Sequence, residues 1–203
     1  MTETWNTNLE ERELLSTSDE DIIRKHQNFS FDLDEFFKRT QNGDYWQQLI
    51  QAHLYFEHVI SQILTEALTR PEAISLSRMG FSQRLDLIVA LALLPDELIA
   101  PIRKISSMRN KISHSLTFEI TDNDIRDLEK CTPAHLRDAL RPDADGNFRP
   151  LKLREILMVI LLKADIIRQQ RAAGRQINKK AELRLRKVLE ETHEKFPDIL
   201  KGR

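Results

Sequence analysis

Apolar residues recur every three or four positions along most of this chain, which is the spacing of helices that bury one face. Over residues 45–69 they fall into two adjacent rows, so this helix is expected to have a wide buried face. Further helices are expected over residues 81–94, 96–116 and 151–171. No segment alternates polar and apolar residues as a half-buried strand does. The pattern therefore predicts an all-α fold, a helical bundle of about five main helices.

Three segments of the chain differ in character. Residues 1–40 are expected to form an N-terminal arm, frayed at first and with one short aromatic helix from about Leu33. Residues 41–175 contain the bundle, whose last helix is expected to end at Gly174, because glycine commonly follows a helix C-terminus. A separate basic amphipathic helix is expected within residues 176–203.

The formal net charge is -1, so no global basic field indicates a nucleic-acid partner. Charge nevertheless varies along the chain. Residues 1–24 carry seven acidic and two basic side chains, whereas residues 168–187 carry eight basic ones and Glu182 alone. The basic segment is either a solvated helix face or a surface for nucleic acid.

Several classes of site and location are excluded or disfavoured. The single cysteine, Cys131, excludes an intramolecular disulfide and a multi-cysteine zinc site. No Gly-rich phosphate loop or HExxH motif is found, so we expect no cofactor and no metal. His53 falls in an apolar row with Glu57, so we expect a core histidine rather than a metal ligand. Without a membrane-length apolar run or a signal-peptide pattern, we expect a cytoplasmic protein with no membrane contact.

The helix expected over residues 96–116 carries a polar face suited to a phosphate. With about 100° between successive residues, His114 points nearly opposite the apolar stripe and stacks on Asn110. Arg103 and Ser107 share this face and are candidate supporting residues. The apolar stripe consists of Leu98, Ile102, Ile105, Met108, Ile112 and Leu116. An imidazole that titrates near neutral pH thus lies beside phosphate donors, unless this is an ordinary solvated face.

Arg109 occupies a different side of that helix. It lies about 40° from the centre of the apolar stripe, where an unpaired guanidinium would be unfavourable. Glu57 lies in a largely apolar row of the helix over residues 45–69. We expect Glu57 to support Arg109 as its buried ion-pair partner. Arg109 then serves as a strut that orients its neighbours, as a phosphate clamp, or as both.

The order Arg109-Asn110, three residues, then His114 resembles the Arg-x4-6-His motif of the HEPN superfamily, in which a polar residue often follows the Arg. Residues 80–87, with the sequence GFSQRLDL, and the Leu/Ala-rich helix after them resemble the branch that contains mannitol operon repressor-like proteins. The resemblance covers about residues 45–131. It implies a HEPN-like helical bundle with Arg109, Asn110 and His114 as catalytic residues.

The resemblance further implies a metal-independent endoribonuclease, of the kind found in toxin and defence systems. His114 would act as general base or acid on the ribose 2′-OH, giving a 2′,3′-cyclic phosphate, while Arg109 and Asn110 would hold the phosphate. The implied assembly is a homodimer in which two motifs face one cleft. The implied partners are RNA and an antitoxin or regulatory protein.

A second hypothesis is a non-catalytic HEPN regulator, similar to the mannitol repressor branch, that binds protein or nucleic acid. RNA binding depends on basic surface, yet residues 96–131 hold six basic against seven acidic side chains. The sequence leaves both hypotheses open.

Overall fold

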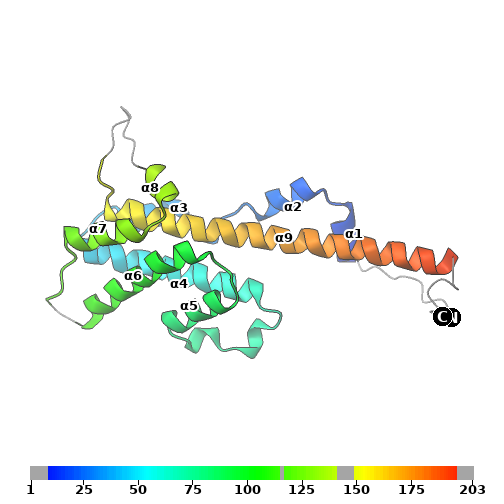
Figure 1. The fold of residues 1–203 in the computed structure, drawn as a ribbon, viewed down its shortest axis with the longest axis horizontal. Coiled ribbons are helices and arrows are strands. Elements are labelled where there is room, and N and C mark those ends of the chain that lie inside the picture. Colours follow the sequence, from blue (N-terminus) through cyan, green and yellow to red (C-terminus); the bar gives the residue numbers. More distant parts are fainter. Residues whose placement is uncertain (1–8, 115–116, 141–148, 196–203) are drawn as a thin grey trace. The chain divides into compact units, whose positions relative to one another are not determined.

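The computed structural model describes residues 9–114, 117–140 and 149–195, and every regular element within these ranges is helical (Figure 1). The predicted all-α class is confirmed. The longer helices are α4 (Tyr45–Ala67), α5 (Phe81–Ala90), α6 (Asp96–His114), α7 (Asp122–Cys131) and α9 (Leu153–Lys195). The shorter elements are α1 (Leu9–Ser16), α2 (Asp19–His26), α3 (Leu33–Thr40), α8 (Ala134–Asp138) and the 3-10 helices η1 (Pro71–Ala73) and η2 (Leu76–Arg78). Leu116, expected in the apolar stripe of α6, lies outside the described residues.

The residues are grouped in two compact units. One, Phe29–Arg168, is the bundle unit and contains α3 to α8 with the first part of α9. The other, the terminal unit, combines Met1–Asn28 with Gln169–Arg203. Within the described ranges, none of the helices is long and apolar enough to cross a membrane.

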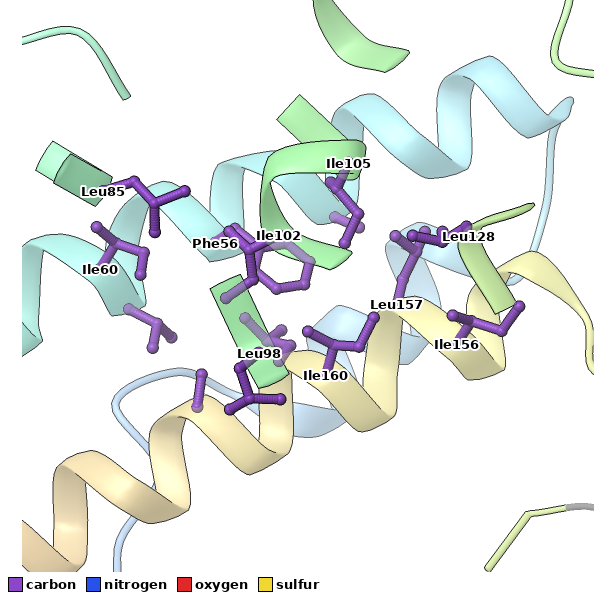
Figure 2. Close-up of a cluster of buried hydrophobic side chains, with 14 of the residues drawn as sticks. Phe56, Ile60, Leu85, Leu98, Ile102, Ile105, Leu128, Ile156, Leu157 and Ile160 are labelled. Carbon is purple, nitrogen blue, oxygen red and sulfur yellow. The ribbon is translucent and has the colours of Figure 1, made fainter. Parts of the chain in front are cut away.

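The core of the bundle unit is built from one face of each main helix. α4 packs against α3, α5 and α6, and α6 also packs against α5 and α7. Figure 2 shows apolar side chains of α4, α5, α6, α7 and α9 meeting in this core. Its members include Phe56, Ile60, Leu85, Leu98, Ile102, Ile105, Leu128, Ile156, Leu157 and Ile160, none more than 1% exposed. Each such side chain contributes about 1.5–3 kcal/mol by leaving water, so these contacts fix how the helices pack.

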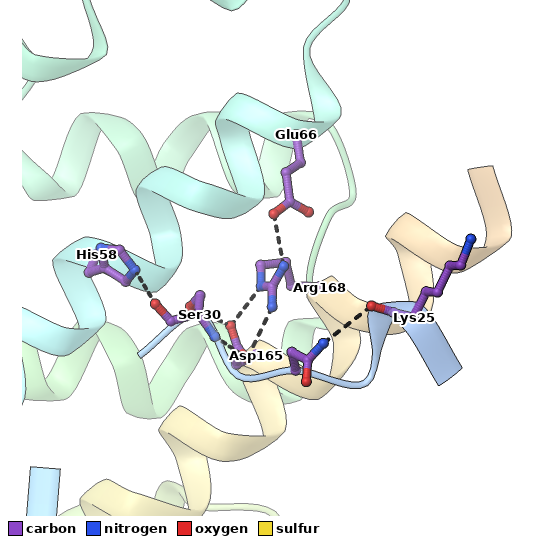
Figure 3. Close-up of polar contacts among 7 residues, drawn as sticks. Lys25, Ser30, His58, Glu66, Asp165 and Arg168 are labelled. Carbon is purple, nitrogen blue, oxygen red and sulfur yellow. Dashed lines mark hydrogen bonds and ion pairs between the residues drawn. The ribbon is translucent and has the colours of Figure 1, made fainter. Parts of the chain in front are cut away.

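An ionic network joins α9 to α4 and to the segment before α3 (Figure 3). The fully buried carboxylate of Asp165 accepts hydrogen bonds from the Ser30 hydroxyl (2.7 Å) and from Nε of Arg168 (2.7 Å). Arg168 also bonds Glu66 of α4 at 2.8 Å. The Ser30 carbonyl lies 2.7 Å from Nε2 of His58. A buried carboxylate is tolerated here because both its oxygens are bonded and a guanidinium neutralises it.

Two expectations for the chain ends are wrong. The residues from Leu9 form α1 and α2 rather than a frayed arm, and both belong to the terminal unit. They are held by Lys180 of α9, whose ammonium bonds the Thr17 carbonyl at 2.6 Å and Asp19 at 2.5 Å. The helix expected to end at Gly174 continues to Lys195, since a glycine inside a helix costs only about 1 kcal/mol.

Helix boundaries next to the predicted site also differ from expectation. α5 ends at Ala90, because Ala92 adopts a left-handed conformation (φ 48°) and the Leu93 N–H bonds the Ile88 carbonyl. The left-handed residue that ends a helix is usually glycine, so the alanine at position 92 does not mark the helix end in the sequence. α6 begins at Asp96 as expected, with Pro101 inside the helix and buried.

Candidate functional site

The two faces of α6 are those expected from its periodicity. Leu98, Ile102, Ile105 and Met108 are at most 1% exposed and face the core, and Ile112 is partly buried. The opposite face is exposed. It carries Arg103, Ser107, Asn110 and His114. α6 therefore presents the predicted polar residues to solvent on a helix whose opposite face is packed in the core.

These four polar residues line one groove of about 500 Å³ between α5 and α6. α5 contributes Ser82 and Leu85. α6 contributes Arg103, Ser106, Ser107, Asn110, Lys111 and His114. The groove thus combines two permanent cations, an imidazole and several neutral hydrogen-bonding groups, and none of the described residues that line it is a carboxylate. Its size is within the range of small-ligand sites.

The α5 wall of the groove is fixed at the start of that helix. The Gly80 N–H donates to the Gln83 side chain at 2.9 Å, which caps the helix so that it begins at Phe81. Phe81, Leu85 and Ile88 are buried, and the turn between them places Ser82 on the groove side. Sequence reasoning missed Ser82 as a wall residue, because that role depends on α5 lying beside α6.

Arg109 does not line the groove. Its Nη1 donates to Oδ1 of Asn110 at 3.4 Å, and Asn110 in turn lines the groove. The prediction of an ion pair between Glu57 and Arg109 is wrong. Among the described residues, the Glu57 carboxylate instead contacts Arg84 and His53.

Arg84 of α5 takes the place that Arg109 was expected to fill. Its Nη2 lies 3.3 Å from the Glu57 carboxylate and its Nη1 bonds the Ser61 hydroxyl at 2.5 Å, while its side chain is only 13% exposed. The sequence held a signal for this contact. Arg84 lies at helical spacing between Phe81 and Ile88, so it falls on the apolar side of α5 and needs a partner there.

His53 is a core histidine, as expected. It is 3% exposed, its ring centroid is 4.6 Å from that of Phe81, and its Nδ1 lies 3.3 Å from Glu57. Burial lowers the pKa of His53 to about 4, and the positive charges of Arg109 and Arg84 act in the same direction against the opposing effect of Glu57. Its buried Nε2 has no hydrogen-bond partner among the described residues. His53 is therefore neutral near pH 7.

The cations of the groove have different neighbours. Nη2 of Arg103 lies 2.9 Å from Asp86 of α5, and both side chains are more than half exposed. The Lys111 ammonium lies 5.7 Å from the ring centroid of Phe118, a weak cation–π contact. The His114 ring is exposed at the end of α6. Within the described residues, no three His, Cys, Asp or Glu side chains are grouped to hold a metal ion.

Comparison with known protein families, with curated proteins and with solved structures found no match to this chain. Functional inference therefore rests on the groove and on the motif residues themselves.

Proposed function

We propose that this protein is a metal-independent endoribonuclease of the HEPN type, and that the α5–α6 groove is its RNA site. One observation carries the proposal. The groove collects an exposed imidazole, His114, with the amide of Asn110 and the guanidinium of Arg103. These groups match the needs of phosphodiester cleavage: an imidazole that can accept or donate a proton, and donors for phosphate oxygens.

The proposed reaction uses the ribose of the substrate as nucleophile. His114 removes the proton of a 2′-OH, and the alkoxide attacks the adjacent phosphorus while the bond to the 5′-oxygen breaks. The 5′-oxygen takes a proton from a general acid as it leaves, and the other product ends in a 2′,3′-cyclic phosphate. Arg103 and Asn110 bind the phosphate oxygens, where charge develops in the transition state. Arg109 is proposed to act through Asn110, which it contacts.

A homodimer would supply the second acid–base group. One motif contains a single histidine, whereas in-line cleavage uses both a base and an acid. Two-fold association is the commonest oligomeric arrangement and would bring two copies of His114 to one cleft. Light scattering at micromolar concentration tests this directly, and a monomeric mass would contradict the two-histidine mechanism.

A non-catalytic regulator that binds protein or nucleic acid is the second candidate. Two observations favour it: Arg109 lies outside the groove lining, and Asp86 already engages Arg103. Both reduce the number of phosphate donors that the groove can offer to the transition state of a cleavage reaction. An antitoxin or regulatory protein is a further proposed partner under either function.

His114→Ala separates the two candidates. If His114 is the acid–base group, cleavage of single-stranded RNA falls by at least about 100-fold, since general acid–base catalysis contributes that much or more. Wild-type cleavage persists in EDTA and yields cyclic phosphate ends. His135→Ala, which removes an exposed histidine of α8, is the matched control and retains full activity. A wild-type protein that binds RNA but never cuts it would favour the regulator.

A further inference from the structure

Asp86 is an acidic residue that contacts the groove from outside its lining. Its Oδ1 lies 2.9 Å from Nη2 of Arg103, a groove-lining residue, and the contact bridges α5 and α6. The side chains of Arg103 and Asp86 are 55% and 60% exposed. The pair is thus open to solvent, at the edge of a groove whose own lining is cationic and neutral.

An exposed ion pair of this kind is weak and replaceable. Such pairs contribute a factor of about two to five in an equilibrium constant, because water and salt screen them. A phosphodiester offers Arg103 two oxygens, and the guanidinium fork matches them in a bidentate arrangement that the single hydrogen bond to Asp86 lacks. A phosphate that enters the groove can therefore replace Asp86 as the partner of Arg103.

We propose that Asp86 is an intramolecular competitor for the RNA phosphate: it holds Arg103 in the free protein and is displaced when RNA binds. The inference rests on the proposed RNA site. Asp86 thereby weakens RNA binding and makes it selective for ligands that offer Arg103 a better partner than one carboxylate. Asp86 touches no substrate itself. It acts through Arg103, so it is a residue that sets affinity rather than a catalytic one.

The chain contains a matched control for this pair. Asp127 of α7 lies 3.9 Å from Lys104, the residue that follows Arg103 on α6, and it is 55% exposed. Neither Lys104 nor Asp127 lines the groove. Asp86→Asn and Asp127→Asn therefore each remove one carboxylate of similar exposure, 60% and 55%, from an ion pair with α6, and only the first frees a groove cation.

The experiment measures binding of a short single-stranded RNA, 2′-O-methylated so that it cannot be cut, by fluorescence anisotropy at several salt concentrations. Asp86→Asn is expected to tighten binding about threefold at low salt. Asp127→Asn is expected to change the affinity less than Asp86→Asn. Arg103→Gln weakens binding and reduces the salt dependence by about one counterion. In the Arg103→Gln background, Asp86→Asn no longer has an effect, because the cation that it would free is gone.

With unmodified RNA, Asp86→Asn lowers KM and leaves kcat unchanged, a pattern that a general loss of fold would not produce. Four results would each overturn the inference. The first two are an equal RNA affinity of wild type and Asp86→Asn, and no RNA binding by either protein. The other two are an equal gain in affinity in Asp127→Asn, and a gain from Asp86→Asn that persists in the Arg103→Gln background. A tightened complex that never cuts RNA would overturn the proposed nuclease and leave the role of Asp86 standing. Cleavage of RNA together with an affinity that Asp86→Asn leaves unchanged would support the proposed nuclease and overturn the role of Asp86.

Discussion

The guanidinium of Arg84 lies 3.3 Å from the carboxylate of Glu57, and this contact joins α5 to α4. Arg84 also donates to the Ser61 hydroxyl and to the Glu57 carbonyl of α4, so one side chain of α5 makes several contacts with the neighbouring helix. Ser82, two residues earlier on α5, lines the groove. The Glu57–Arg84 contact therefore helps to hold the α5 wall at its distance from α4.

We expect Arg84→Ala to lower the free energy of unfolding by about 2 kcal/mol, because a partly buried carboxylate and hydroxyl lose their partner. Arg109→Ala is expected to cost less than about 1 kcal/mol, as its hydrogen bond is to an exposed neighbour. Urea denaturation measures both values. An Arg109→Ala protein as unstable as Arg84→Ala would contradict the assignment of Glu57 to Arg84.

The buried His53 predicts a specific pH dependence of stability. Its pKa is about 4 in the folded protein, against an ordinary value of 6.5, so the unfolded chain binds more protons between these values. The stabilisation from neutral His53 is therefore complete above about pH 6.5 and is lost as the pH falls towards 4, on the order of 3 kcal/mol in all. His53→Leu removes this dependence. Parallel pH profiles of unfolding free energy for the two proteins would contradict the prediction.

Lys180 is expected to hold the N-terminal helices within the terminal unit. Its side chain is 4% exposed and bonds Asp19 and the Thr17 carbonyl. Lys180→Ala should speed amide hydrogen exchange in α1 and α2 by about tenfold, which corresponds to the loss of one to two hydrogen bonds. Lys179→Ala, at an exposed neighbouring position, is the control and should leave exchange unchanged. Equal exchange in both variants would show that other contacts hold these helices.

Gly174 lies inside α9, and among the described residues no atom lies within 4 Å of the place that a Cβ would occupy, its two chain neighbours and the helix's own nearby backbone aside. Gly174→Ala should therefore stabilise the protein by about 0.5–1 kcal/mol, because alanine restricts the unfolded chain more and favours the helix. Ala181→Gly, an exposed position of the same helix, should lose a similar amount. Thermal unfolding followed by circular dichroism measures both changes. A less stable Gly174→Ala protein would indicate that the glycine has a role other than helix continuity.

The sequence by itself determined the helical class and the two faces of α6. Apolar spacing is a local property, so it placed Leu98 and Ile105 in the core and His114 on the opposite, exposed face. The same periodicity assigned Arg103, Ser107 and Asn110 to one side of one helix, and they line one groove. The assignment of RNA cleavage to these residues stays a proposal.

Only the tertiary structure decided which partners meet across helices. The helical pattern suggested Arg109 as the partner of Glu57, and the packing of α5 on α4 paired Glu57 with Arg84 instead. No sequence pattern links Asp86 to Arg103, and the two residues bond because α5 and α6 lie side by side. Periodicity fixes the direction of a side chain about its own helix axis, whereas a contact between helices also depends on their separation, rotation and crossing angle, and these come from the packing of the whole core.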